Sequence, residues 1–235
     1  MKTRMCSAAL LLTMSAAAFA GRPLVTDDAS FIKKGGVEVE AFYRRQTERD
    51  TPTLTGFHVQ PSVGIGLNTQ IGLGVDYSRQ YNADFDASKS SGQYALVGKT
   101  GLKELTDDAY GIAVAYGVDR TRAPGESFRY DNAVINGVVT VPVRQWLFHA
   151  NLGWARSRVD ATNATTWALA AERTGAIGPV DLGVETFGTD HEPAWVQVAA
   201  RWVVKEDRFF VDASYGAQTG SSHAKLLTIG TKMAF

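Results

Sequence analysis

From Val37 to the end of the chain, apolar and polar residues alternate with a period of two in one segment after another. Successive side chains of a β-strand point to opposite faces, so this period predicts strands, each with one apolar face. We expect about twelve, an even number of the kind that single-chain bacterial outer-membrane barrels use. The expected strands are Val37–Arg44, Phe57–Leu67, Ile71–Ser78, Gln93–Leu105, Tyr110–Asp119, Asn132–Val141, Trp146–Trp154, Thr166–Arg173, Val180–Gly188, Ala194–Val204, Phe209–Gly216 and Leu227–Phe235.

The connections between these segments alternate in length. Short ones are expected at Asn68–Thr69, Thr106–Asp108, Pro142–Gln145, Thr174–Pro179 and Lys205–Asp207. Longer polar ones are expected at Gln46–Thr55, Asn82–Gly92, Arg122–Asp131, Val159–Thr165, Thr189–Pro193 and Gln218–Ala224. Short periplasmic turns and longer extracellular loops are typical of transmembrane β-barrels.

The fold class that follows is all-β, a single closed antiparallel transmembrane barrel whose apolar face meets lipid. Lipid cannot hydrogen-bond an open strand edge, so the first and last strands must pair. Aromatic residues should form a girdle at each end of the apolar face, where rings with a polar edge meet lipid head groups. The outer girdle would contain Tyr43, Phe57, Tyr77, Tyr94, Trp154, Trp167 and Tyr215, and the periplasmic one Tyr110, Trp146, Phe148, Trp202, Phe209 and Phe235.

The first twenty residues have the features of a cleavable signal peptide. Lys2 and Arg4 precede a run of apolar and small residues that ends at Ala18-Phe19-Ala20. The only cysteine, Cys6, lies within this segment, so the mature chain would contain neither a disulfide nor a thiolate metal site. The expected organisation is a signal peptide at 1–20, a periplasmic or plug segment at 21–36, and the barrel at 37–235.

The composition limits the classes of molecule that the protein can bind. The formal net charge is zero, which argues against nucleic-acid binding. We expect no cofactor, no metal and no catalytic residues. The expected location is the outer membrane of a Gram-negative cell, among membrane lipid and lipopolysaccharide. The expected assembly signal is the terminal Phe235, which closes an alternating strand of the kind that the barrel-assembly machinery reads.

The start of the mature chain resembles a known family. Arg22-Pro23-Leu24-Val25-Thr26-Asp27-Asp28-Ala29, followed by Gly35-Gly36-Val37-Glu38-Val39-Glu40, is similar to the mature N-terminus of the "MetA-pathway of phenol degradation" outer-membrane family. The likeness covers about 25 residues. It implies an outer-membrane barrel, often described as a transporter, that is linked to small hydrophobic or aromatic compounds.

Charged residues fall on the inward face of the expected strands. Such residues of mixed sign can line a polar channel, or they can pair and close the lumen. A barrel of about twelve strands lies between sizes that fill with side chains and sizes that leave a water channel. The candidate lumen-lining residues are Glu38, Glu40, Arg44, His58, Asp76, Lys99, Asp119, His149, Asp181, Glu185, Arg201, Asp212 and Lys232.

Two further features each have two interpretations. The inward aromatic residues could form a path for an aromatic solute, or they could pack against the N-terminal segment; they are Phe42, Phe187, Trp195 and Phe210. Residues 21–36 could enter the lumen as a plug through Thr26, Asp27 and Asp28, or they could form a periplasmic tether with a local turn.

The favoured function is passive diffusion of a small, hydrophobic or aromatic solute through an outer-membrane channel. A non-conducting structural or adhesive barrel is the first alternative. An outer-membrane hydrolase is the second, and its candidate residues are His149 and the cluster Asp190-His191-Glu192. Charged clusters in loops are usually only solvated, and no acid–base pair is evident in the sequence.

Overall fold

The computed structural model describes residues 23–82 and 87–235, which form one barrel of twelve strands. The signal peptide expected at 1–20 lies outside the described residues. The strands are β1 (Val37–Glu48), β2 (Thr51–Gly66), β3 (Thr69–Asn82), β4 (Ala87–Lys103), β5 (Gly111–Arg122), β6 (Arg129–Val143), β7 (Trp146–Ser157), β8 (Thr162–Ile177), β9 (Val180–Thr189), β10 (Trp195–Lys205), β11 (Phe209–Gln218) and β12 (Lys225–Ala234).

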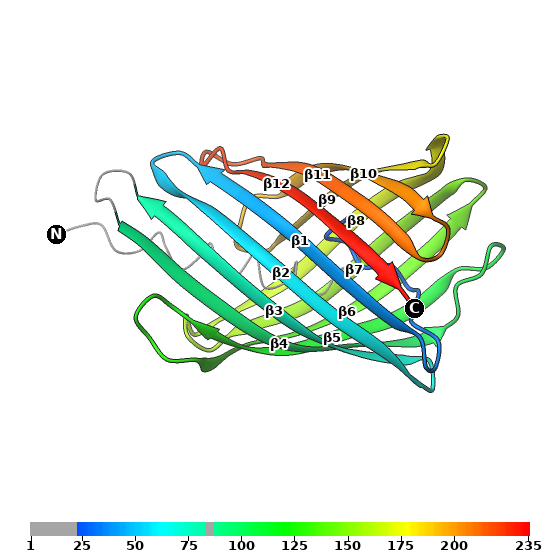
Figure 1. Cartoon of the computed structure of the whole chain (residues 1–235), viewed down its shortest axis with the longest axis horizontal. Coiled ribbons are helices and arrows are strands. Elements are labelled where there is room, and N and C mark those ends of the chain that lie inside the picture. Colours follow the sequence, from blue (N-terminus) through cyan, green and yellow to red (C-terminus); the bar gives the residue numbers. More distant parts are fainter. Residues whose placement is uncertain (1–22, 83–86) are drawn as a thin grey trace.

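Each strand pairs antiparallel with its neighbours in sequence, and β1 closes the barrel against β12 (Figure 1). At the seam, the Phe235 N–H donates to the Val37 carbonyl at 2.9 Å, and the Val37 N–H donates back at 3.3 Å. Closure leaves no unpaired sheet edge, as lipid requires. Both the fold class and the strand count predicted from the alternation are confirmed. In the described ranges, no helix is long and apolar enough to cross a membrane.

The two faces of the wall differ as the alternation predicts. On β3 the outward side chains are apolar and exposed, for example Leu73 at 52%. Inward positions carry polar or small side chains, and the inward His58 of β2 is 2% exposed. An exposed apolar belt around a polar interior is the arrangement that a lipid bilayer stabilises. Residues of both predicted girdles are exposed on the outside, among them Tyr43, Phe57, Tyr77, Tyr94, Trp154, Tyr215, Tyr110, Trp146, Phe148, Trp202 and Phe235.

The connections correct the sequence analysis at several places; β4, for example, begins at Ala87, inside the expected long loop Asn82–Gly92. The expected long loop Gln46–Thr55 is a turn at Arg49 and Asp50, because β1 and β2 continue pairing as far as Glu48 and Thr51. The expected short turn Thr106–Asp108 belongs to a longer connection, 104–110, which contains a small bridge between Thr106 and Ala109. Polar residues near a strand end do not by themselves stop cross-strand pairing, so boundaries were the weakest part of the prediction.

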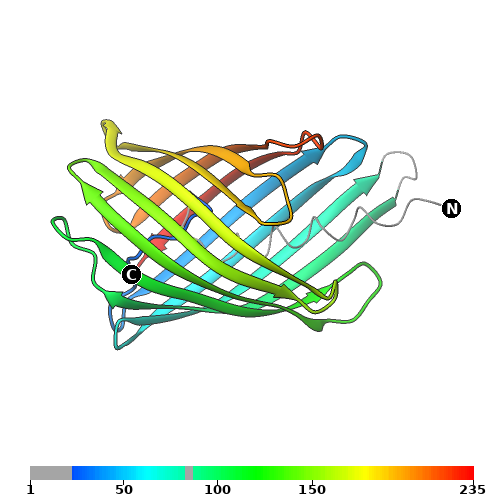
Figure 2. The ribbon, with the colours of Figure 1, turned by 180° about the vertical axis from the view of Figure 1, so that it is seen from behind.

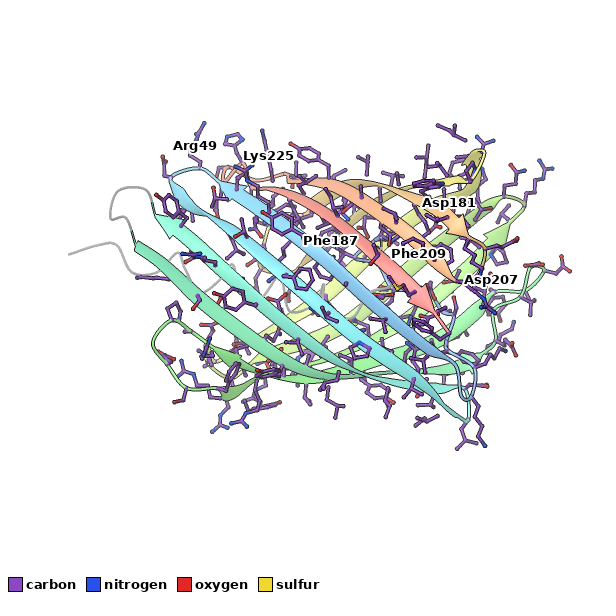
Figure 3. All side chains as sticks on the ribbon, in the orientation of Figure 1. Arg49, Asp181, Phe187, Asp207, Phe209 and Lys225 are labelled. Carbon is purple, nitrogen blue, oxygen red and sulfur yellow. The ribbon has the colours of Figure 1, made fainter. Side chains whose placement is uncertain are left out.

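The barrel has two distinct ends. Figure 3 shows Arg49 and Lys225 at one end and Asp181 and Asp207 at the other. We call the end with the C-terminus and the start of β1 the inner end, and the end with Arg49 the outer end. On this topology the inner end is the predicted periplasmic side.

Candidate functional site

Residues 23–36, here called the N-terminal segment, lie inside the barrel rather than beside it. In both ribbon views the blue chain before β1 lies within the ring of strands (Figure 1, Figure 2). Its first residue, Pro23, accepts a hydrogen bond from Gln197 near the outer end of β10, at 3.5 Å. Its last residues pair with Gly64 of β2 at the inner end, where the Gly35 N–H donates to the Gly64 carbonyl at 2.8 Å. The segment therefore crosses the lumen from its outer half to its inner mouth.

The strongest attachment of the segment is the carboxylate of Glu185 on β9. It accepts hydrogen bonds from the Val25 N–H (2.8 and 3.0 Å) and the Thr26 N–H (2.8 Å). The Thr26 hydroxyl donates at 2.7 Å and the Gln197 amide at 2.8 Å. Glu185 is 2% exposed, so the segment's backbone replaces water around a buried charge. Charge-assisted hydrogen bonds of this kind are among the stronger ones in proteins.

Further along, neutral side chains hold the backbone of the segment. Asn151 of β7 accepts from the Asp27 N–H at 2.7 Å and donates to the Asp27 carbonyl at 3.0 Å. Thr140 of β6 accepts from the Ala29 N–H at 2.9 Å and also contacts the His149 Nδ1 at 3.0 Å. These contacts place His149, a candidate catalytic residue, beneath the segment.

One cation of the wall pairs with the acidic residues of the segment. Lys99 Nζ on β4 lies 3.2 Å from Asp27 Oδ1 and 3.7 Å from Asp28 Oδ1, and it donates to the Asp28 carbonyl at 3.0 Å. Thr26, Asp27 and Asp28 thus all take part in contacts between the segment and the barrel. Glycines allow the close approach, because a Cβ at Gly64 would overlap the Lys33 carbonyl.

The opposite wall, β10 to β3, carries a different set of charges. One continuous row of cross-strand neighbours runs from Arg201 through Asp212, Gly230, Phe42 and His58 to Asp76. Arg44 reaches this row across Gly56, where a Cβ would lie 2.9 Å from the Arg44 Nε. We call six of the inward side chains of this wall the polar belt: Phe42, Arg44, His58, Asp76, Arg201 and Asp212.

Two arginine–aspartate pairs form the polar belt. Arg44 Nη2 donates to Asp76 Oδ1 at 2.7 Å, and Arg201 Nε donates to Asp212 Oδ1 at 2.9 Å. Each pair lies beside an aromatic ring. Phe42 stacks on His58 with ring centroids 4.7 Å apart, and the Arg201 guanidinium lies 5.2 Å from the Phe210 ring centre. Each arginine of the polar belt is therefore matched by an aspartate.

A polar cavity of about 80 Å³ lies at the inner mouth, between the N-terminal segment and the wall. Ser30 and Ile32 of the segment form one side. On the other side Lys232 lies 2.7 Å from Glu38 Oε2 and 3.7 Å from Glu40 Oε1. The remaining lining residues are Asp28, Phe31, Gln60, Ser62, Gln70 and Lys99.

Other candidates from the sequence lie elsewhere. Asp119 is buried near the outer end, where it accepts hydrogen bonds from Gln93 and Asn132. Asp181 accepts from the Gly175 N–H in the turn before β9, so it orders a turn. Phe187 and Trp195 stack in parallel with centroids 6.2 Å apart, and Val25 of the segment packs against them. The four inward aromatic residues therefore do not form one continuous path.

The outer connection between β9 and β10 carries the cluster Asp190-His191-Glu192. His191 Nε2 lies 3.5 Å from Asp190 and 2.9 Å from the Asn163 carbonyl, on an exposed surface. Burial raises the pKa of Glu192 to about 7, and the nearby Glu48 carboxylate adds to this effect. Within the described part of the chain, no group of three or more metal-ligating side chains gathers as a metal site would require.

Sequence reasoning missed the neutral residues that hold the segment. Gln197, Asn151, Thr140 and Gln70 all hydrogen-bond to it, and Gln197 is only 1% exposed. Charge was the criterion for lumen candidates, so inward amides and hydroxyls received no attention. The alternation of apolar and polar positions already places these residues on the inward face, and that position would have identified them as candidates.

A closed strand wall with an apolar exterior and a polar interior defines the class: this is an outer-membrane β-barrel protein. The chain belongs to the family described as "Uncharacterised conserved protein UCP029691", whose model matches residues 8–235. No curated protein sequence matches the chain. The resemblance to the phenol-degradation family stays a prediction.

Solved structures with this fold include channels and an enzyme. The chain is similar to the COG4313 outer membrane channel from Pseudomonas putida F1, with a TM-score of 0.60 at 9% identity, covering 88% of this chain and 98% of that one. It is similar to the KdgM porin solved in complex with disordered oligogalacturonate, with a TM-score of 0.59 at 11% identity, covering 83% of this chain and 99% of that one. It is also similar to outer membrane phospholipase A from Escherichia coli, with a TM-score of 0.53 at 8% identity, covering 88% of this chain and 93% of that one. At these identities the likeness concerns the fold.

Proposed function

We propose that the protein is a passive outer-membrane channel for small solutes, narrowed by its N-terminal segment. The observation that carries this proposal is the polar cavity of about 80 Å³ beside the segment at the inner mouth. A barrel that served only as a structural wall would gain by filling this space with apolar side chains, since unfilled space forfeits packing contacts. The channels among the similar folds agree with this proposal.

The second part of the proposal concerns the identity of the solute. The resemblance at the N-terminus favours hydrophobic or aromatic compounds. The inner wall itself favours small polar solutes, because its aromatic rings lie apart and stack on polar or aromatic neighbours. An aromatic solute therefore belongs in the test as a separate arm.

Vesicle swelling tests the proposal directly. We expect vesicles containing the barrel to swell in arabinose faster than protein-free vesicles and faster than vesicles with heat-unfolded protein. Sodium benzoate in place of arabinose forms the aromatic arm. Swelling at the protein-free rate in both solutes would contradict the channel and favour a structural or adhesive barrel.

A hydrolase remains the third candidate function. Its test is lipid or ester hydrolysis by the purified barrel, with His191→Ala and His149→Ala as variants. Activity that either substitution abolishes would replace the channel proposal with an enzymatic one.

A further inference from the structure

The lipid-facing surface of the barrel carries an apolar groove of about 450 Å³ that crosses β4 to β7. Two rows of outward cross-strand neighbours line it. They are Leu96, Val118 and Ala133 in the row nearer the outer end, and Tyr116, Ile135 and Trp154 in the next row toward the inner end. We call this hollow the lipid-facing groove.

Small residues and one tethered ring give the groove its shape. A Cβ at Gly98 would lie 2.5 Å from the Tyr116 ring, so the ring occupies the space above this glycine. The Tyr116 hydroxyl lies 3.3 Å from the Thr100 Oγ1 of β4. The ring therefore leans toward β4 and away from Ala133 of β6, whose side chain is only a methyl group.

Two arginines lie at the outer edge of the groove. Arg156 of β7 is the cross-strand neighbour of Ala133, and Arg120 of β5 is the next outward residue after Val118. Both side chains are exposed, and within the described ranges neither forms an ion pair with a carboxylate. Arg120 donates one hydrogen bond, to the Phe128 carbonyl at 3.0 Å. Because a guanidinium carries five N–H donors, both arginines keep donors for a ligand.

The surroundings of Arg120 set its depth in the membrane. Its cross-strand neighbours are Tyr94 and Tyr130, which are 48% and 41% exposed. Exposed tyrosines of a barrel lie at the level of the lipid head groups. The guanidinium of Arg120 therefore lies among head groups, and the groove continues from it toward the hydrocarbon. Arg120 and Arg156 are two strands apart, which separates their backbones by roughly 10 Å.

Charge and shape together define the occupant. A guanidinium binds phosphate oxygens through paired, charge-assisted hydrogen bonds, whereas the apolar groove suits an acyl chain. The outer end is the predicted extracellular side, and the outer leaflet there contains lipopolysaccharide, a phosphorylated and multiply acylated glycolipid. A second copy of the chain fits less well, since a two-fold contact through this groove would bring the same arginines together.

We propose that the lipid-facing groove binds one molecule of lipopolysaccharide, with Arg120 and Arg156 on the phosphates of its lipid A part and an acyl chain in the groove. The site lies on the outside of the wall. It therefore stands or falls separately from the proposed channel.

The first test counts lipid A molecules on the refolded barrel by native mass spectrometry in detergent. We expect one tightly bound molecule per wild-type barrel. Arg120→Gln/Arg156→Gln should weaken binding by about tenfold or more, because charge-assisted hydrogen bonds to phosphate are lost. The control Arg45→Gln/Lys225→Gln removes two exposed cations from the outer ends of β1 and β12, on the opposite side of the barrel, and should bind as wild type does.

A second test changes shape and leaves the protein's charge intact. Ala133→Phe fills the groove and should weaken lipid A binding several-fold. Ala150→Phe, in a different apolar groove over β6 to β10, is the control and should leave binding unchanged. Dephosphorylated lipid A should bind wild type and the Arg120/Arg156 double variant equally weakly. Heat-modifiable gel mobility checks that each variant folds.

Several results would overturn the proposal. Equal lipid A binding by wild type and the Arg120/Arg156 double variant would remove the phosphate contact, and equal weakening by the Arg45/Lys225 control would reduce it to general attraction. Phosphatidylglycerol bound as tightly as lipid A would show a site for any anionic lipid. Lipid-free dimers that Ala133→Phe separates would show that the groove is covered by a second copy of the chain.

Discussion

The two walls of the lumen use similar side chains for different purposes. On the wall from β6 to β9, Glu185, Asn151 and Thr140 are bonded to backbone atoms of the segment. On the opposite wall, Arg44 and Arg201 bond to aspartates and keep unpaired atoms among the described residues. The difference separates residues that hold the N-terminal segment from residues that pair with one another within the wall.

Removing the segment should produce the largest change. Deletion of residues 24–34 takes away the backbone that crosses the lumen and leaves the strands that form the barrel. We expect single-channel conductance to rise several-fold, because the cross-section open to water increases. The measurement is current through single barrels, with heat-modifiable mobility as the check on folding. Unchanged conductance would mean that the segment does not restrict the passage.

Weakening the strongest attachment should have a smaller effect. Glu185→Ala removes the acceptor for the N–H groups of Val25 and Thr26, which would then be buried without a partner. We expect a loss of about 2 kcal/mol or more in unfolding free energy and noisier single-channel current. Glu206→Ala, in the exposed turn between β10 and β11, is the matched control. A quiet current at wild-type stability would show that Glu185 does not hold the segment.

A steric change at the inner end tests the contact between the segment and β2 without altering charge. Gly64→Ala places a Cβ against the carbonyl groups of Ile32 and Lys33, so the segment must move away from β2. We expect a modest change in conductance and a lower melting temperature. Gly137→Ala, whose Cβ would meet its nearest atom at 3.6 Å, should behave as wild type. Equal behaviour of the two variants would argue against close packing of the segment.

The smallest expected effect concerns pH at the outer connection. Burial raises the pKa of Glu192 to about 7 from an ordinary 4.5, so the folded state holds a proton that the unfolded state releases between these values. Stability should therefore fall as pH rises from about 4.5 to about 7. In the wild type this slope should lower the melting temperature by about 2–4 °C across that pH range. Glu192→Gln should remove the slope. Parallel melting curves for both proteins would contradict the shift.

The alternation alone predicted all twelve strands and the side of each that faces lipid, because the period of two is a direct consequence of strand geometry. It could not place the N-terminal segment. Residues 23–36 have no strand or helix period, and their position depends on hydrogen bonds to residues more than a hundred positions away, such as Glu185. The aspartate partners of Arg44 and Arg201 were equally hidden, since they depend on the register between strands.

Locking the segment in place is the most direct test of a passage beside it. A Cβ at Gly111 would lie 2.9 Å from the Ala29 Cβ and 2.7 Å from the Leu105 Cβ, so Ala29→Cys with Gly111→Cys can form a disulfide once both neighbours move by about 1 Å. If solutes pass beside the segment, oxidised and reduced barrels should conduct equally. A conductance that disappears on oxidation and returns on reduction would show that the segment must leave the lumen before anything passes.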